Sequence, residues 1–166
     1  MKDLTIIVPV YNEARTVKEI MDALVTHCND AQIIYVDDGS KDDSLKILRS
    51  AARAQDLVLT KPNGGKGSAI RFGIARATGR YTVIQDADLE YHPRQIASLY
   101  NEAVSHPDTA IFGSRFLKPN PNLYKRYLLG NKAVTLVVNI LYFTRLTDSY
   151  TCYKLFPTSM LTAFPL

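Results

Sequence analysis

Short apolar runs of strand length alternate with segments of helical periodicity along most of the chain, and this alternation constrains the fold more than any other feature. The run at 4–10 is continuous and rich in β-branched residues, as in a strand that is buried on both faces. Further strands are expected at 33–36, 57–59, 81–85 and 110–112, and helices near 17–25, 42–54, 68–77 and 96–104. The pattern predicts an α/β fold with a Rossmann-like, mostly parallel sheet flanked by helices.

Polar and acidic residues follow three of the predicted strands at the point where each strand ends. These segments are Tyr11-Asn12-Glu13, Asp37-Asp38-Gly39-Ser40 and Asp86-Ala87-Asp88. In an open parallel sheet, ligands bind beyond the carboxyl ends of the strands. We therefore expect the three segments to converge on one rim of the sheet and to form the ligand site there.

Asp86 and Asp88 directly follow a predicted strand, and Glu90 comes two residues later. Two carboxylates on a tight turn can bind a hard divalent cation such as Mg²⁺ or Mn²⁺, which also takes oxygen ligands from substrate phosphates. Asp-x-Asp is common as a solvated turn, so the position after a buried strand is what favours a metal site. Glu90 is a possible third ligand, and His92 beside this turn is expected to be structural.

Two further segments favour nucleotide binding, although each has a simpler interpretation. Asp37 or Asp38 can accept hydrogen bonds from a base or a ribose, but either can instead cap the following helix, as can Ser40. The glycine-rich run at 64–68 contains Lys66 and departs from both the P-loop pattern and the dinucleotide-binding pattern. It can still let a diphosphate or a base approach the amides at a helix start.

Basic residues occupy the segment 109–147 without any Asp or Glu. They are Arg115, Lys118, Lys125, Arg126, Lys132 and Arg145. Such a segment suggests an anionic partner, a phosphate or a membrane surface, or else a solvated basic face. Within it a loop is expected at 117–123 and a long helix at 127–143, whose wide apolar face suits either a membrane interface or a buried core. A last strand is expected at 150–156.

Two cysteines, Cys28 and Cys152, are too few for a disulfide framework or a four-ligand zinc site, and reduced thiols in a cytosolic compartment are expected. Apolar runs stay shorter than the roughly 18 residues of a membrane-spanning helix. The first residues also lack the layout of a signal peptide. The histidines and cysteines show no spacing typical of a nucleophilic hydrolase.

Together, several of these segments resemble family 2 glycosyltransferases of the GT-A fold, in the branch that makes polyprenyl- or dolichyl-phosphate sugars. The segments that carry the resemblance are 7–13, 36–40, 63–69, 86–93, 112–116 and 147–156. They follow the family's order along nearly the whole chain. The resemblance implies one GT-A catalytic domain over 1–166, truncated at its C-terminal side because members usually continue well past Phe156.

The resemblance also implies the site residues and the reaction. The residues that would contact the nucleotide are Pro9, Tyr11, Glu13, Asp38, Lys66 and Asp86. The ligands of Mg²⁺ or Mn²⁺ would be Asp86, Asp88 and Glu90. The catalytic residues would be Asp88, Arg115 and Arg126, and the two arginines would face phosphate. The enzyme would be a metal-dependent, inverting hexosyltransferase. It would move a sugar from a UDP- or GDP-sugar to a polyprenyl or dolichyl phosphate, in the cytoplasm at a membrane face, with no nucleic-acid partner.

Other acceptors and functions make distinct demands on the sequence. A lipid phosphate is already anionic and needs no strong general base, which agrees with the lack of an obvious one. A polysaccharide or glycan hydroxyl would need a carboxylate base, for which Asp148 is the candidate. A non-catalytic nucleotide-sugar-binding module would need no metal pair, and a nucleotidyltransferase would need a glycine-rich basic loop after the first strand.

Overall fold

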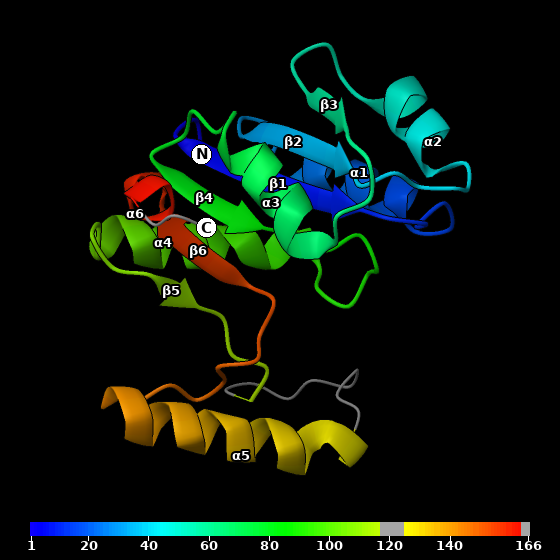
Figure 1. Ribbon diagram of the computed structural model, residues 1–166. Coiled ribbons are helices and arrows are strands. Elements are labelled where there is room, and N and C mark those ends of the chain that lie inside the picture. The colour runs from blue at the N-terminus through cyan, green and yellow to red at the C-terminus, as the bar shows by residue number, and fades with distance from the viewer. Residues whose placement is uncertain (117–124, 164–166) are drawn as a thin grey trace.

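The computed structural model describes residues 1–116 and 125–163, and the side chains of 125–129 are not part of that description. A six-stranded sheet forms its centre (Figure 1). In spatial order the strands are β3 (Leu57–Thr60), β2 (Gln32–Asp37), β1 (Leu4–Val10), β4 (Tyr81–Ile84), β6 (Lys154–Pro157) and β5 (Ile111–Phe112). The first four are parallel, and β6 runs antiparallel to β4 and β5. The predicted mostly parallel α/β sheet is confirmed.

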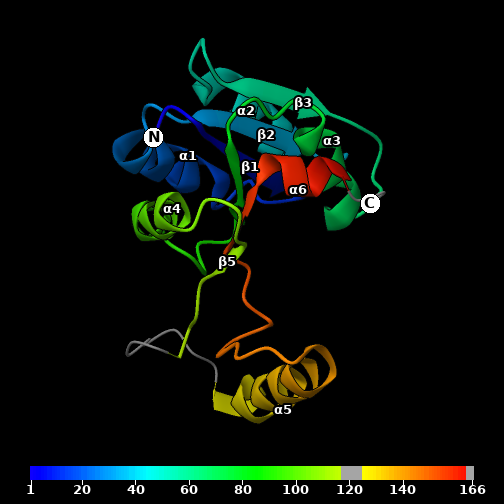
Figure 2. The same ribbon diagram turned by 90° about the vertical axis from the view of Figure 1, so that its left-hand side faces the viewer.

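Helices cover both faces of this sheet (Figures 1 and 2). The helices are α1 (Val17–His27), α2 (Ser44–Ala51), α3 (Lys66–Ile74), α4 (Ile96–Ser105), α5 (Lys125–Tyr142) and α6 (Thr158–Ala163), with one 3₁₀ turn, η1 (Pro93–Gln95), before α4. In β1, Ile6 and Val8 belong to the core that includes α1 and α4, whereas Ile7 belongs to the core under α3. Burial on both faces explains why the run at 4–10 is apolar at every position except Thr5, whose buried hydroxyl donates a hydrogen bond to Gln32.

Three predicted helix starts are wrong by two residues, among them that of α5, which was predicted at 127 and begins at Lys125. Helix α2 begins at Ser44, and Ser40 does not cap it, because the Ser40 hydroxyl accepts a hydrogen bond from the Asn12 amide at 3.1 Å instead. Helix α3 begins at Lys66, earlier than predicted, since Gly65 adopts a φ of 83° and turns the chain directly into the helix. That conformation is in the left-handed region, which glycine enters without a steric penalty.

The chain around the last strand differs from the prediction as well. Strand β6 begins at Lys154, whereas a strand was predicted from residue 150. The preceding segment is held in an irregular conformation by hydrogen bonds, among them one from the Tyr150 amide to the Asp148 carboxylate at 3.2 Å. These bonds to a side chain replace the ladder bonds that a longer strand would form. The loop predicted at 117–123, with Lys118, lies outside the described residues.

Helix α5 lies apart from the sheet and from the helices that cover it, and both views show the separation (Figures 1 and 2). It is reached from β5 and returns toward β6. Its connection to the rest of the chain includes the segment 146–149, to which the Thr135 and Asn139 side chains are hydrogen bonded. The predicted long helix is therefore confirmed as a separate element.

Candidate functional site

The carboxyl ends of the neighbouring strands β2, β1 and β4 meet at one rim of the sheet, where they border a cavity of about 380 Å³. This donor cavity is lined by Pro9, Val10, Tyr11, Glu13, Asp38, Asn63, Gly65, Lys66, Ala69, Asp86, Ala87 and Asp88. The predicted convergence of three polar segments is thus confirmed. The cavity also gathers every residue that was predicted to contact a nucleotide.

Asp38, at the end of β2, holds the glycine-rich loop that closes one side of the cavity. Its buried carboxylate accepts hydrogen bonds from Lys61 Nζ at 2.6 Å and from the amides of Gly64 and Gly65 at 3.1 and 2.7 Å. Burial alone would raise the pKa of Asp38, but these donors outweigh it and lower that pKa. Asp38 therefore remains ionised and ties the loop to the strand end.

The start of helix α3 brings a cation to the rim. Lys66 is the first residue of this helix, and its Nζ lies 2.6 and 2.8 Å from the two carboxylate oxygens of Asp86. Burial would lower the pKa of Lys66, yet the hydrogen bond and the charge of Asp86 outweigh it and raise that pKa. The two residues form an ion pair between the helix start and the end of β4.

The acidic turn after β4 does not form a closed metal cage. Asp86 is nearly buried, whereas Asp88 is exposed and its Oδ1 accepts a hydrogen bond from the Glu90 amide at 3.0 Å. The Glu90 carboxylate lies 3.8 Å from Arg115 Nη1. Burial, followed by the charge of Asp88, raises the pKa of Glu90. Across residues 1–116 and 125–163, no three His, Cys, Asp or Glu side chains are grouped to hold a metal ion.

The turn after β4 is supported by two buried residues, Gln85 and Tyr153, that the sequence did not reveal. The fully buried Gln85 amide nitrogen donates to the carbonyl oxygens of Asp86 and Tyr91, both at 2.9 Å. Its Oε1 accepts a hydrogen bond from the Tyr153 hydroxyl at 2.6 Å. Leu89 in the turn has a φ of 64°, a conformation that non-glycine residues seldom adopt. The only available sequence signal was a glutamine at the end of an apolar strand.

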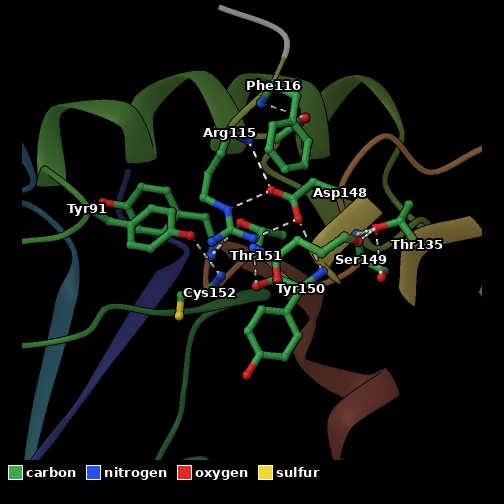
Figure 3. A network of polar contacts seen from close by, with 12 residues as sticks. Tyr91, Arg115, Phe116, Thr135, Asp148, Ser149, Tyr150, Thr151 and Cys152 are labelled. Carbon is green, nitrogen blue, oxygen red and sulfur yellow. Dashed lines mark hydrogen bonds and ion pairs between the residues drawn. The ribbon is translucent and has the colours of Figure 1, made fainter. Parts of the chain in front are cut away.

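Arg115 and Asp148 form the centre of a second polar network (Figure 3). Arg115 Nε and Nη2 donate to the two Asp148 oxygens at 2.8 and 3.0 Å. The backbone amides of Arg115 and Tyr150 donate to the same carboxylate, each at 3.2 Å. The Asp148 side chain is 0% exposed, so its oxygens are shielded from an incoming hydroxyl. This geometry argues against Asp148 as a general base.

Other candidate residues have simpler positions. Burial raises the pKa of Cys28 to about 11 and that of Cys152 to about 12, and Asp86 adds to the second shift. Both free thiols therefore stay protonated at neutral pH. His92 accepts a hydrogen bond from the Arg94 amide and caps η1, a structural role as expected. The Arg126 side chain lies outside the described residues, so its contact with phosphate stays a prediction.

The chain is similar to a known protein family and to curated relatives. Residues 5–162 match the family described as Glycosyl transferase family 2. The undecaprenyl-phosphate 4-deoxy-4-formamido-L-arabinose transferase of Sodalis glossinidius is 40% identical over 113 residues, which are 63% of this chain and 35% of that protein. Its counterpart from Klebsiella pneumoniae is 35% identical over 111 residues, or 62% of this chain and 34% of that protein. The matches thus span about a third of these curated relatives.

Solved structures show the same fold at low sequence identity. Glucosyl-3-phosphoglycerate synthase from Mycobacterium tuberculosis, in complex with Mn²⁺, UDP and phosphoglyceric acid, has a TM-score of 0.77 at 18% identity, covering 98% of this chain and 58% of that chain. Staphylococcus aureus TarS 1–349 in complex with UDP has a TM-score of 0.65 at 17% identity, covering 97% and 48%. These likenesses confirm the GT-A fold.

Proposed function

The chain belongs to glycosyl transferase family 2, and on that premise we propose that it moves a sugar from a UDP- or GDP-sugar to a polyprenyl phosphate with inversion. The observation that carries the proposal is the donor cavity, where Asp86, Asp88 and Lys66 face the same space at the carboxyl ends of the strands. The names of the two curated relatives specify undecaprenyl phosphate and a sugar.

The donor nucleotide would lie along the rim, with its diphosphate at the start of helix α3. Amide groups in the first turn of a helix have no partner within the helix and favour an anion. Lys66 adds a positive charge at the same place, and Pro9, Tyr11, Glu13 and Asp38 line the remainder of the donor cavity. The chain itself therefore supplies both a diphosphate end and a base end to the cavity.

A divalent cation fits the residues present on the turn after β4. Asp86 and Asp88 provide two carboxylates, which matches the one or two that Mg²⁺ usually takes from a protein when it also binds substrate phosphates. Mg²⁺ or Mn²⁺ bound there would neutralise the charge that develops on the leaving nucleoside diphosphate. Glu90 as a third ligand stays a prediction, because its carboxylate faces Arg115.

The acceptor proposal follows from the Asp148 carboxylate, which is buried and fully engaged in hydrogen bonds. A hydroxyl acceptor needs a base within hydrogen-bond reach, and the Asp148 oxygens are already bonded to Arg115 and to two backbone amides. A phosphate monoester carries its own negative charge and needs none. The acid-free segment 109–147 would hold that phosphate, with Arg126 as the predicted contact.

Helix α5 supports a membrane surface as the place where acceptor and enzyme meet. Its polar side chains Thr135 and Asn139 are bonded to the segment 146–149, which leaves the apolar side uncovered. Exposed apolar residues of α5 are Val134, Leu136, Val137, Ile140, Leu141 and Tyr142, and Phe143 follows the helix; this set is called here the α5 face. An apolar helix face accompanied by cations is typical of a helix lying in a bilayer interface.

The basic residues of this region make an anionic surface the matching partner. Lys132 and Arg145 are exposed and flank the α5 face in the sequence, and no acidic residue occurs between Asp108 and Asp148. Each such cation adds about 1 kcal/mol of attraction to an anionic leaflet. Within the described part of the chain, every helix falls short of the length or apolarity needed to cross a bilayer. From the apolar and basic residues of this region we propose that the enzyme works at the cytoplasmic face of a membrane.

A panel of UDP- and GDP-sugars tests the proposed reaction. The full chain is incubated with each donor and Mn²⁺, with and without a polyprenyl phosphate, and release of nucleoside diphosphate is followed together with labelled lipid product. One donor is expected to give lipid-linked sugar only when the polyprenyl phosphate is present. Transfer to a glycan hydroxyl with none to lipid phosphate would contradict the acceptor, and an absence of any transfer would favour a binding module.

A further inference from the structure

The two carboxylates proposed to bind a cation are in different electrostatic states. The side chain of Asp86 is 11% exposed, and both of its oxygens are contacted by Lys66 Nζ, at 2.6 and 2.8 Å. Asp88 is exposed, and its Oδ1 accepts a hydrogen bond from a backbone amide, that of Glu90. One carboxylate of the pair is thus neutralised by an ammonium group while the other keeps its charge.

A divalent cation that arrives without a nucleotide would meet a poor site. It would be repelled by the Lys66 ammonium beside Asp86, and the Glu90 carboxylate lies near Arg115 at 3.8 Å. Among the three predicted ligands, only the Asp88 carboxylate has no cationic partner within the described part of the chain. Removing the ammonium charge beside Asp86 would remove this repulsion, and a cation should then bind about tenfold more tightly.

We propose that Lys66 is a resident counter-ion of Asp86 which leaves it only when the donor diphosphate arrives, so that the divalent cation and the nucleotide sugar bind together. This rests on the proposed donor site and adds an order of binding to it. The incoming diphosphate offers Lys66 new anionic oxygens, and Asp86 is released to the cation that accompanies them. Lys66 thereby positions the metal site without touching the reacting carbon.

The position of Lys66 makes this exchange possible. Its side chain is 50% exposed, and a lysine reaches its partners through a flexible four-carbon chain. It lines the donor cavity and also a second cavity of about 420 Å³, so its side chain borders free space in both. Because Lys66 is the first residue of α3, a diphosphate bound at that helix start would lie within its reach.

Lys61 provides a matched control on the same rim. Its Nζ lies 2.6 Å from Asp38, the same distance as in the Lys66–Asp86 pair, but Asp38 is not one of the proposed metal ligands. Replacing either lysine by methionine removes one positive charge from the rim. A general electrostatic effect on cation binding would therefore appear in both variants, whereas release of Asp86 would appear only in Lys66→Met.

The experiment measures Mn²⁺ binding by electron paramagnetic resonance for the full chain and for Lys66→Met, Lys66→Arg and Lys61→Met. Each protein is titrated with Mn²⁺ alone and then with UDP or GDP present. Lys66→Met is expected to bind Mn²⁺ alone about tenfold more tightly than the unmodified chain. Lys66→Arg keeps the charge and should stay near the unmodified chain, as should Lys61→Met.

A second readout is the coupling between the two ligands. The nucleoside diphosphate should strengthen Mn²⁺ binding more in the unmodified chain than in Lys66→Met, because only the former must free Asp86. Circular dichroism verifies that each variant is folded. A gain in Lys66→Met no greater than in Lys61→Met would overturn the inference, as would equally tight Mn²⁺ binding by the unmodified chain with and without nucleotide.

The measurements also separate this inference from the proposed function. Sugar transfer with equal Mn²⁺ binding by the unmodified chain and Lys66→Met would overturn the inference alone. Failure to bind Mn²⁺ even with UDP and GDP, together with no sugar transfer, would overturn the metal-dependent function and the inference with it.

Discussion

Two ion pairs lie near the turn that follows β4, and they differ in burial and in the number of their hydrogen bonds. Arg115 and Asp148 form a buried, bidentate pair whose carboxylate also receives two backbone amides. Lys66 and Asp86 join a half-exposed ammonium to a single carboxylate. Breaking the first pair would leave a buried charge without a partner, which lowers the free energy of unfolding. The second pair is partly solvated, so Lys66 can exchange its partner more easily.

The comparison also explains how one turn can be both rigid and reactive. The Arg115–Asp148 pair anchors the chain before β6, and Gln85 with Tyr153 anchors the turn from inside the core. Lys66 contacts the same turn from the solvent side, where a ligand can compete for it. Rigid support on one side and an exchangeable cation on the other are suited to a site that must bind and release a charged donor.

The largest expected effect comes from breaking the buried pair. Asp148→Ala leaves the Arg115 guanidinium, 11% exposed, without its carboxylate, and should lower the free energy of unfolding by about 3–5 kcal/mol. Urea denaturation measures this loss. Lys66→Met is the comparison, and its loss should be smaller, because the carboxylate that it leaves, that of Asp86, borders the donor cavity and can be solvated there. Equal losses in the two variants would remove the distinction between the pairs.

Asp88→Ala tests the reactive side of the same turn. Loss of this proposed metal ligand should lower sugar transfer by about a hundred- to a thousandfold, the size of effect seen when one group that stabilises developing charge is removed. The unfolding free energy should hardly change, since Asp88 is exposed. Asp22→Ala, at an exposed aspartate of α1, is the control. Undiminished turnover in Asp88→Ala would exclude the metal-dependent mechanism.

Helix α5 extends the comparison to a part of the molecule outside the sheet. Replacing Leu136 and Ile140 together by serine should weaken binding to anionic lipid vesicles by at least about tenfold, because each buried aliphatic side chain contributes about 1.5–3 kcal/mol. Vesicle co-sedimentation measures this change. Val104→Ser alters an exposed apolar residue of α4 and should leave vesicle binding as it was. An equal loss of vesicle binding in Val104→Ser and in the double variant would show that the effect is not specific to the α5 face.

The smallest expected effect is on the pH dependence of stability that Asp38 contributes. Asp38 lies in the part of the donor cavity that is proposed to bind the nucleobase. The pKa of Asp38 is lowered in the folded chain, so its contribution to stability is complete above the pKa of the unfolded chain and is lost as the pH falls through the folded value. Asp38→Asn should therefore be less stable than the parent at pH 7, by about 1 kcal/mol. The difference should shrink on acidification below pH ~4, where aspartate titrates in an unfolded chain. A constant difference across that range in urea denaturation would contradict this assignment.

Local patterns predicted much of the fold, because they depend on residues that are close in sequence. The run at 4–10 alternates between two cores, and strands of this kind can be recognised from apolar continuity alone. The cap proposed for Ser40 failed because its hydroxyl binds the Asn12 amide, which lies 28 residues away in sequence. The strand expected from residue 150 begins late for a similar reason. The Tyr150 amide donates its hydrogen bond to the Asp148 carboxylate and not to a neighbouring strand.

The sequence by itself determined the α/β class, the rim on which the three polar segments converge, and the existence of a long helix with an apolar face. Only the tertiary structure decided which carboxylate has which partner: Lys66 with Asp86 is a contact across 20 residues, and Arg115 with Asp148 is one across 33. It also decided that the apolar side of α5 is the exposed one, since Thr135 and Asn139 face the chain. Periodicity reveals which residues share a face, whereas long-range packing decides what that face meets.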